Sequence, residues 1–426
     1  MMIDTVIALL KKSEAKAWEI TDTHTDGLEF YFIRHKLDQN RVKKTEHLNV
    51  TVYVAMDNDG YGIASGEIYP TYTEKEMEEA IHALCANAKY AKNKAYALNE
   101  KKDVKIENEN CNLYENASAF IQTLQSVKET ETEFINSYEI FTNVHTKRFI
   151  NSNGIDVTET YPESMAEVII NARNDAHEIE VYRMYRSGMC DEASMKKDIE
   201  KAMQYGHDRL SAIDTPNNLS VPVLLSGSDG ISVYRYLLSR MNTGLIYQGI
   251  SHCEKGTDLI ESRVGDPINI HSLVYLPNSS MNHVIDEEGA VIEEKSLIEN
   301  NVATCLYGAR RFSQYLGQNN TFNLTNWCVD PGTNRENEIR NRDYLEIVEF
   351  SGLEISEMTG DIFGEIRLGY LHEGNRVTVV KGGSISGNIQ DQFKDMLFSD
   401  ELTQYNNVRI PSLTCLKHVT IAGCAK

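Results

Sequence analysis

The stretch LNVTVYVAMDNDGYGIAS, residues 48–65, decides how the first half of this chain folds. Apolar and polar side chains alternate on both sides of Asn58-Asp59-Gly60, which is the period-two pattern of half-buried strands joined by a turn. GLEFYFIRH, residues 27–35, alternates in the same way. The stretch therefore predicts antiparallel strands with one face on a core.

Helices are predicted on either side of these strands. Ile3, Val6, Ile7, Leu10 and Trp18 fall at helical spacing. A capping box, Thr73-x-x-Glu76, opens a second helix that carries Met77, Ile81, Leu84 and Ala88 on one face.

Further elements complete this half. We expect helices at 113–126 and 194–210, with strands between them that turn at Asn151-Ser152-Asn153-Gly154. The first half is therefore predicted to be an α+β domain, residues 1–215.

A break near residue 216, where Pro216 and Pro222 flank polar residues, precedes a second domain, residues 216–426. It should start with a short strand, Val221–Leu225, and an amphipathic helix that reaches Gly249 and has Asp229 available as its cap. Its apolar stripe consists of Ile231, Tyr234, Leu237, Leu238, Met241 and Leu245.

From residue 262 onward the pattern is mostly short strands and loops. Residues 364–383 predict a hairpin with Glu373-Gly374-Asn375 at its tip, and residues 412–423 a final strand. The fold class expected for the chain is thus α+β: an N-terminal α+β domain followed by a mostly β C-terminal domain with a few helices.

The charge of the chain disfavours several partners. With 42 basic and 63 acidic residues in 426, the net charge is −21, which repels phosphate backbones and anionic lipids. The longest apolar run near the N-terminus, Val6–Leu10, is too short for a signal peptide, and no later run could span a bilayer. We expect a cytoplasmic protein that binds neither nucleic acid nor membrane. The eight cysteines include no CxxC pair and are expected to be reduced, mostly buried thiols.

Five segments occur in an order that resembles the TldD/PmbA family. They are FINSNGIDVTET (149–160), the helix led by SGSDG (226–230), residues 284–312, NWCVDPGTNRENEI (326–339), and the closing stretch from GYLHEGNRVTVVKGG (369–383) to the final IAG. This family is described as modulators of DNA gyrase and as metallopeptidases that act in proteolysis or in the processing of small peptides and proteins. The resemblance covers nearly the whole chain.

The helix after residue 229 distinguishes the two kinds of family member. TldD-type chains carry HExxxH there, in which two imidazoles hold the metal and a glutamate serves as general base. No histidine lies between His207 and His252 in this sequence, and the polar positions of the helix include Arg235, Ser239 and Arg240. The chain therefore resembles the PmbA (TldE) type, which pairs with a metal-bearing TldD chain.

Other candidate residues have simpler structural interpretations. His252-Cys253-Glu254 suggests a nucleophile with its base, but adjacent side chains diverge. Cys415 and His418 are of metal-ligand type, yet three positions apart on one strand they face opposite sides. We expect Cys415 to be a core residue.

A glycine loop and an arginine cluster also invite functional interpretations. GGSISGNI, residues 382–389, has the glycine spacing of a phosphate loop but lacks its lysine and hydroxyl, and should instead cap a helix at 389–397. Arg335, Arg340 and Arg342 should lie at a solvated helix start, with a peptide carboxylate or a partner subunit as the alternative ligand.

We assign no catalytic, cofactor-binding or metal-ligating residue to this chain, and expect zinc or iron in a TldD-type partner. The leading hypothesis is a non-catalytic subunit that forms a shared peptide cavity with that homologue, or with a second copy. One alternative is a self-sufficient hydrolase whose metal or nucleophile is assembled from His252, Cys253, His271 or His283 across a homodimer. The other is a gyrase-related, protein-binding regulator.

Overall fold

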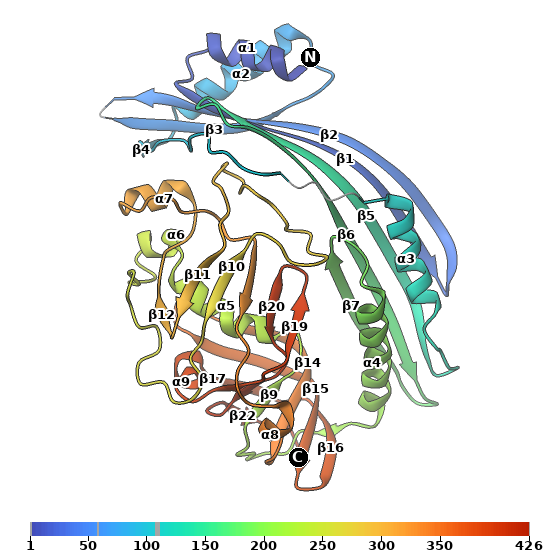
Figure 1. The fold of residues 1–426 in the computed structure, drawn as a ribbon. Coiled ribbons are helices and arrows are strands. Elements are labelled where there is room, and N and C mark those ends of the chain that lie inside the picture. Colours follow the sequence, from blue (N-terminus) through green and yellow to red (C-terminus); the bar gives the residue numbers. More distant parts are fainter. Residues whose placement is uncertain (1, 58, 107–110, 426) are drawn as a thin grey trace.

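A long curved sheet, which arches over the rest of the molecule, is the main feature of the computed structural model (Figure 1). The structure describes residues 2–57, 59–106 and 111–425. The seven strands are antiparallel, in the order β4-β3-β2-β1-β5-β6-β7. They are β1 (Ala17–Ile33), β2 (Lys36–Met56), β3 (Gly60–Ile68), β4 (Lys92–Lys94), β5 (Glu133–Asn151), β6 (Asp156–Arg173) and β7 (Glu178–Ser187).

The predicted strands at residues 48–65 form the hairpin β2–β3, in which Leu48 lies opposite Ile68. Asn58 of the predicted turn lies outside the described residues, while Asp59 has a φ of 51°. The deciding stretch therefore forms the structure that its alternation predicts.

Four helices cover one face of this sheet, the helix-bearing face, in two pairs. α1 (Met2–Lys12) and α2 (Glu74–Ala88) pack near Trp18 and Ile20 of β1. α3 (Leu113–Gln125) and α4 (Glu192–Ser211) pack near Phe30 of the same strand. These three β1 residues share a face because side chains alternate along a strand. The opposite, inner face meets the C-terminal half of the chain.

Two further sheets make up the C-terminal half. One has the order β18-β21-β9-β14-β15-β16-β8, with β17 and β22 beside it, and the other β12-β11-β10-β13-β20-β19. The first comprises β8 (Ile213–Asp214), β9 (Val223–Leu225), β14 (Tyr344–Ile355), β15 (Asp361–Glu373), β16 (Arg376–Lys381), β17 (Ser384–Asn388), β18 (Leu397–Phe398), β21 (Thr414–Leu416) and β22 (Thr420–Ala422). The second comprises β10 (Ile270–Leu273), β11 (Lys295–Glu299), β12 (Val302–Ala303), β13 (Asn326–Val329), β19 (Leu402–Tyr405) and β20 (Val408–Pro411).

Five short helices accompany these sheets: α5 (Gly230–Arg240), α6 (Thr243–Tyr247), α7 (Arg310–Tyr315), α8 (Glu336–Ile339) and α9 (Ile389–Phe393). α5 lies in the main core, where its buried residues pack with Val223 and Ile347 of one sheet and with Ile298 and Trp327 of the other. The α+β fold class, with a mostly β second half, is confirmed. β8 lies before residue 216 in the chain but pairs with β16 of the C-terminal half. The division into two domains at residue 216 stays a prediction.

Two boundaries predicted near the C-terminus were wrong. Residues 412–423 form two strands instead of one, because β21 pairs with β9 and β18 whereas β22 pairs with β17. The helix predicted at 389–397 ends at Phe393, since Leu397 already belongs to β18.

Candidate functional site

Helix α5 occupies the place where a metal helix would be expected, and its side chains do not fit a metal. Its sequence, GISVYRYLLSR, offers no imidazole, thiol or carboxylate. The Ser239 hydroxyl donates to the carbonyl of Tyr236 at 2.8 Å, and the Arg240 guanidinium donates to the carbonyl of Ile250 at 3.0 Å. Arg235 is exposed and cationic. The polar positions of α5 are thus bonded to backbone or repel cations.

The apolar stripe packs as predicted, but the helix is interrupted. Tyr234, Leu237 and Met241 are buried, with at most 1% of each residue exposed. α5 ends at Arg240, and Asn242 opens the separate helix α6 by accepting from the backbone N–H of Gly244 at 2.8 Å. The continuous helix to Gly249 was therefore wrong, because the Asn242 side chain competes for the backbone of the next turn.

Asp229 does not cap α5 with its side chain, so this part of the prediction was also wrong. Its backbone is already helical, with φ −59° and ψ −29°, whereas a capping aspartate has an extended backbone. Burial raises the pKa of the Asp229 carboxyl above its usual value.

Within one chain, the four residues of the self-sufficient hydrolase hypothesis are not brought together, and their assembly across a homodimer stays a prediction. Among the described residues, no hydrogen bond or ion pair joins any two of them. His252 is exposed, Cys253 is buried with a raised pKa, His271 pairs with Asp330 at 3.1 Å, and His283 contacts the N-terminal sheet.

Cys415 and His418 lie in different environments. Cys415 is fully buried in a small apolar cluster, and burial raises the pKa of its thiol to about 11. His418 lies beyond β21, with its Nε2 2.8 Å from the carboxylate of Asp395. The prediction of Cys415 as a core residue is confirmed.

The glycine loop and the arginine cluster have structural roles. Asn388 caps α9 by accepting from the backbone N–H of Gln390 at 3.0 Å, as the turn prediction requires. Arg340 donates twice to the carboxylate of Glu346, at 2.5 and 3.0 Å. Arg335 and Arg342 flank α8 and are exposed, and their binding of a carboxylate or a partner stays a prediction.

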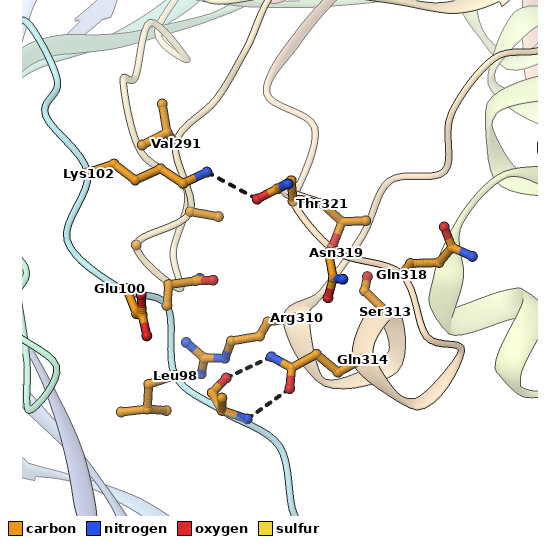
Figure 2. Close-up of a pocket in the computed structure, with 15 residues that line it drawn as sticks. Leu98, Glu100, Lys102, Val291, Arg310, Ser313, Gln314, Gln318, Asn319 and Thr321 are labelled. Atoms are coloured by element: carbon orange, nitrogen blue, oxygen red, sulfur yellow. Dashed lines mark hydrogen bonds between the residues drawn. The ribbon is translucent and has the colours of Figure 1, made fainter.

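A cavity of about 300 Å³ opens between the two halves of the chain, and polar groups dominate it (Figure 2). It is bounded by residues 97–102, the turn at 289–291, and α7 with the loop that follows it. Gln314 bridges both backbone groups of Ala97 at 2.8 Å, and Lys102 donates to Asn320 at 3.3 Å. The free lining groups are mainly amides and hydroxyls, which suit a peptide backbone.

Arg310 closes one wall of this cavity (Figure 2) and joins the two halves. It is 3% exposed and donates to both carboxylate oxygens of Glu19 on β1, at 2.8 and 3.3 Å. The Tyr53 hydroxyl donates to the same carboxylate at 2.6 Å, and the Glu288 carboxylate accepts from the Arg310 backbone N–H at 2.7 Å. Burial raises the pKa of Glu288. The charge of Arg310 is therefore matched within the chain.

Another polar network lies on the inner face of the long sheet. His145 contacts the Thr25 hydroxyl through Nδ1 at 2.9 Å and the Glu163 carboxylate through Nε2 at 3.0 Å. The hydrogen bond from His145 lowers the pKa of Glu163. The order hydroxyl, imidazole, carboxylate is that of a nucleophile relay, but Thr25 is only 6% exposed, so a substrate has no access to its hydroxyl.

Next to this network, His283 joins the C-terminal half to β6. Its ring packs edge-to-face on Tyr161, with centroids 4.4 Å apart, and its Nδ1 lies 3.8 Å from Glu159. Burial lowers the pKa of His283 to about 4 and raises that of Glu159. No sequence motif indicates either network, because the members come from strands whose pairing cannot be read from the sequence.

One group of three His, Cys, Asp or Glu side chains in the described part of the chain lies close enough to share a metal ion: Asp22, His24 and Glu46. It belongs to the N-terminal sheet and not to α5. No sequence motif marks these three residues.

Comparisons with known proteins agree with this arrangement. A family model for the PmbA/TldA metallopeptidase C-terminal domain matches residues 219–423. A search of curated proteins found no match. In the described residues, no helix is both long enough and apolar enough to cross a membrane.

Three solved structures share the fold over nearly the full length. TldE from Thermococcus kodakarensis is 14% identical with a TM-score of 0.80, and covers 99% of this chain and 100% of its own. A "putative modulator of a DNA gyrase" from Thermotoga maritima is 17% identical with a TM-score of 0.78, over 99% of both chains. A similarly described protein from Bacteroides thetaiotaomicron is 16% identical with a TM-score of 0.78, over 99% and 98%. Residues 219–423 therefore resemble the C-terminal domain of PmbA/TldA metallopeptidases, and the chain as a whole has the fold of TldE.

Proposed function

We propose that this chain is the TldE-type subunit of a TldD/PmbA-type metallopeptidase that acts on small peptides or proteins in the cytoplasm. In this proposal a TldD-type homologue supplies the metal, the general base and the water. The observation that carries the proposal is the composition and packing of α5: its apolar side is buried in the core, and its polar side has no group that could hold a metal.

The contribution of this chain is to form part of a peptide cavity. Two features support this role: the amide-rich cavity at 97–102 and 289–321, and the polar inner face of the long sheet. Backbone amides of a peptide need both donors and acceptors, which the side chains of Asn319 and Gln318 supply. We propose that a peptide passes along this wall toward the metal site of the partner.

The test combines this chain with the TldD-type protein of the same organism. Peptide cleavage is measured for each chain alone, for the mixture, and for the mixture after alanine replaces the partner's HExxxH histidines. We expect cleavage by the mixture, and its loss with the partner's ligands. Cleavage by this chain alone, or cleavage that survives the loss of those ligands, would show that the catalytic groups are here.

Light scattering on the same samples distinguishes the possible assemblies. A TldD–TldE pair should have the summed mass of the two chains. A stable homodimer of this chain that does not bind the TldD-type protein would instead favour the alternative of a gyrase-related, protein-binding regulator.

The cavity can be tested separately. Asn319→Trp should fill it and raise the KM of the mixture for peptide several-fold with little change in kcat. Asn337→Trp, on the exposed surface of α8, is the control that adds the same side chain elsewhere. Equal kinetics for the two variants would remove the cavity from the proposal.

A further inference from the structure

The helix-bearing face of the long sheet has a polar section between its two helix pairs. Asp22 and His24 lie two positions apart on β1, so their side chains project from the same face. Glu46 on the adjacent strand β2 lies directly opposite His24 in the antiparallel register. The potential ligand atoms of the three side chains all lie within 4.8 Å of one another.

Asp22 is bonded through only one of its carboxylate oxygens. The residue is 8% exposed, its Oδ2 is 3.2 Å from Nε2 of His24, and its Oδ1 is buried without a hydrogen-bond partner. A buried carboxylate oxygen of this kind loses hydration and gains nothing in return, so it calls for a ligand. A cation between the three side chains would neutralise this carboxylate.

The surrounding charges favour a cation. Arg148 lies opposite Asp22 on β5, but both of its donated hydrogen bonds, at 2.8 and 2.9 Å, go to Asp156. Among the described residues, the Glu46 carboxylate has no hydrogen bond or ion pair. In the described part of the chain, neither carboxylate forms a hydrogen bond or ion pair with a lysine or arginine, although Arg148 attracts Asp22 electrostatically.

We propose that Asp22, His24 and Glu46 bind a divalent transition-metal ion, with zinc as the best fit. One imidazole nitrogen and two carboxylate oxygens are ligands that zinc accepts, whereas magnesium and calcium prefer oxygen alone. Tetrahedral zinc bonds of about 2.0–2.2 Å place ligands roughly 3.4 Å apart, so modest side-chain rotation closes the site. The His24 side chain is 51% exposed, which leaves room for a water as the fourth ligand.

This site is independent of the proposed peptidase role, since it lies on the face of the sheet opposite Glu19 and the cavity. Its consequence is structural: the ion would join β1 to β2. Because two of the three ligands are partly exposed, the bound ion should exchange with solvent.

The experiment measures zinc binding to the tag-free, chelator-treated full chain by isothermal titration calorimetry. Co²⁺ serves as a spectroscopic probe, since tetrahedral coordination gives visible absorption bands. We expect one zinc per chain at this site, at least tenfold weaker binding for His24→Ala and for Glu46→Gln, and loss of the cobalt bands in both. Both positions are on the surface, and circular dichroism checks that the variants fold.

His47→Ala is the matched control. His47 is the neighbour of Glu46 on the opposite face of β2 and pairs with Glu67 at 2.7 Å, so it offers a histidine and a carboxylate without a third ligand. Its loss should leave the zinc affinity unchanged. Equal affinities of the wild type, His24→Ala and Glu46→Gln would overturn the proposal, as would binding of Mg²⁺ as tightly as Zn²⁺.

Discussion

Replacing Arg310 by alanine should destabilise the chain more than most single substitutions. The change removes the guanidinium from a site where Glu19 is bound at 2.8 Å, and it leaves that carboxylate buried without a cation. At an effective dielectric constant of about 20, two charges at that distance attract by roughly 6 kcal/mol. Desolvation offsets most of this attraction in the intact pair, but removal of Arg310 alone leaves the Glu19 charge buried and uncompensated, and the loss expected for such a change is about 3–5 kcal/mol.

The double variant Glu19→Gln/Arg310→Met isolates the pair itself. With neither charge present, the Glu19 site no longer holds a buried ion without its partner, and most of the lost stability should return. The Tyr53 hydroxyl, which donates to Glu19 at 2.6 Å, can donate to the glutamine oxygen instead. We therefore expect strong coupling between the two positions in a double-mutant cycle.

The two tryptophans make the assay specific for each half. Trp18 precedes Glu19 on β1, and Trp327 lies in β13 of the C-terminal half. Urea unfolding is followed by fluorescence in Trp18→Phe and Trp327→Phe backgrounds. The two transitions should coincide in the parent and separate after Arg310→Ala. A loss below about 1 kcal/mol, or single losses that simply add in the double variant, would refute the reasoning.

Three other measurements test the buried groups. Leu237→Ala should cost about 2–5 kcal/mol in unfolding free energy because it leaves a cavity in the core, whereas Arg235→Ala, on the exposed side of the same helix, should change it by less than about 0.5 kcal/mol. Burial lowers the pKa of His283 from 6.5 to about 4, so the unfolded chain binds this proton at a higher pH than the folded chain does. The free energy of unfolding should therefore fall by about 3 kcal/mol through this group between pH 6.5 and pH 4. His283→Gln should remove that part of the acid sensitivity, as measured by urea unfolding at a series of pH values. A thiol reagent should label exposed Cys424 in the native protein but reach Cys253 only after unfolding. Rapid labelling of Cys253 in the native protein would support the interpretation of Cys253 as a nucleophile.

Local sequence signals sufficed where a few adjacent residues determine the backbone. The capping box is an example: the Thr73 backbone N–H donates to Glu76 at 2.7 Å, and the Glu76 backbone N–H donates back to the Thr73 hydroxyl at 3.3 Å. The hairpin tip at Gly374, with φ +57°, is another. The same kind of reasoning failed at Asn242, where an apolar stripe continued across a helix break.

Long-range pairing was beyond the sequence. Residues 36–47 form the first half of β2 although they are mostly polar and exposed on both faces, so no alternation marked them as a strand. β1 pairs with β5, more than 100 residues later in the chain. Without that register, neither the bond between Thr25 and His145 nor the position of Glu46 opposite His24 could be inferred.

The lack of imidazole ligands on the candidate metal helix could be predicted from the sequence, because that prediction needs only the residue types of the segment. No residue from Asp208 to Ser251 is a histidine, whatever the fold. Which individual side chains and atoms are buried, by contrast, could be determined only from the structure. It shows that Cys253 is inside the core and that the Oδ1 atom of Asp22 lacks a partner.

The position of β9 also affects the order in which the chain can fold. This three-residue strand lies between β14 and β21, and Leu224 pairs with Cys415, 191 positions later. During synthesis, one edge of β9 must therefore wait until residues 414–416 have left the ribosome, and closing so long a loop slows folding. In the meantime the apolar side chains of α5 and β9 stay open to other chains. A newly made chain should thus depend on chaperones, and deletion of residues 414–422 should yield an aggregating product.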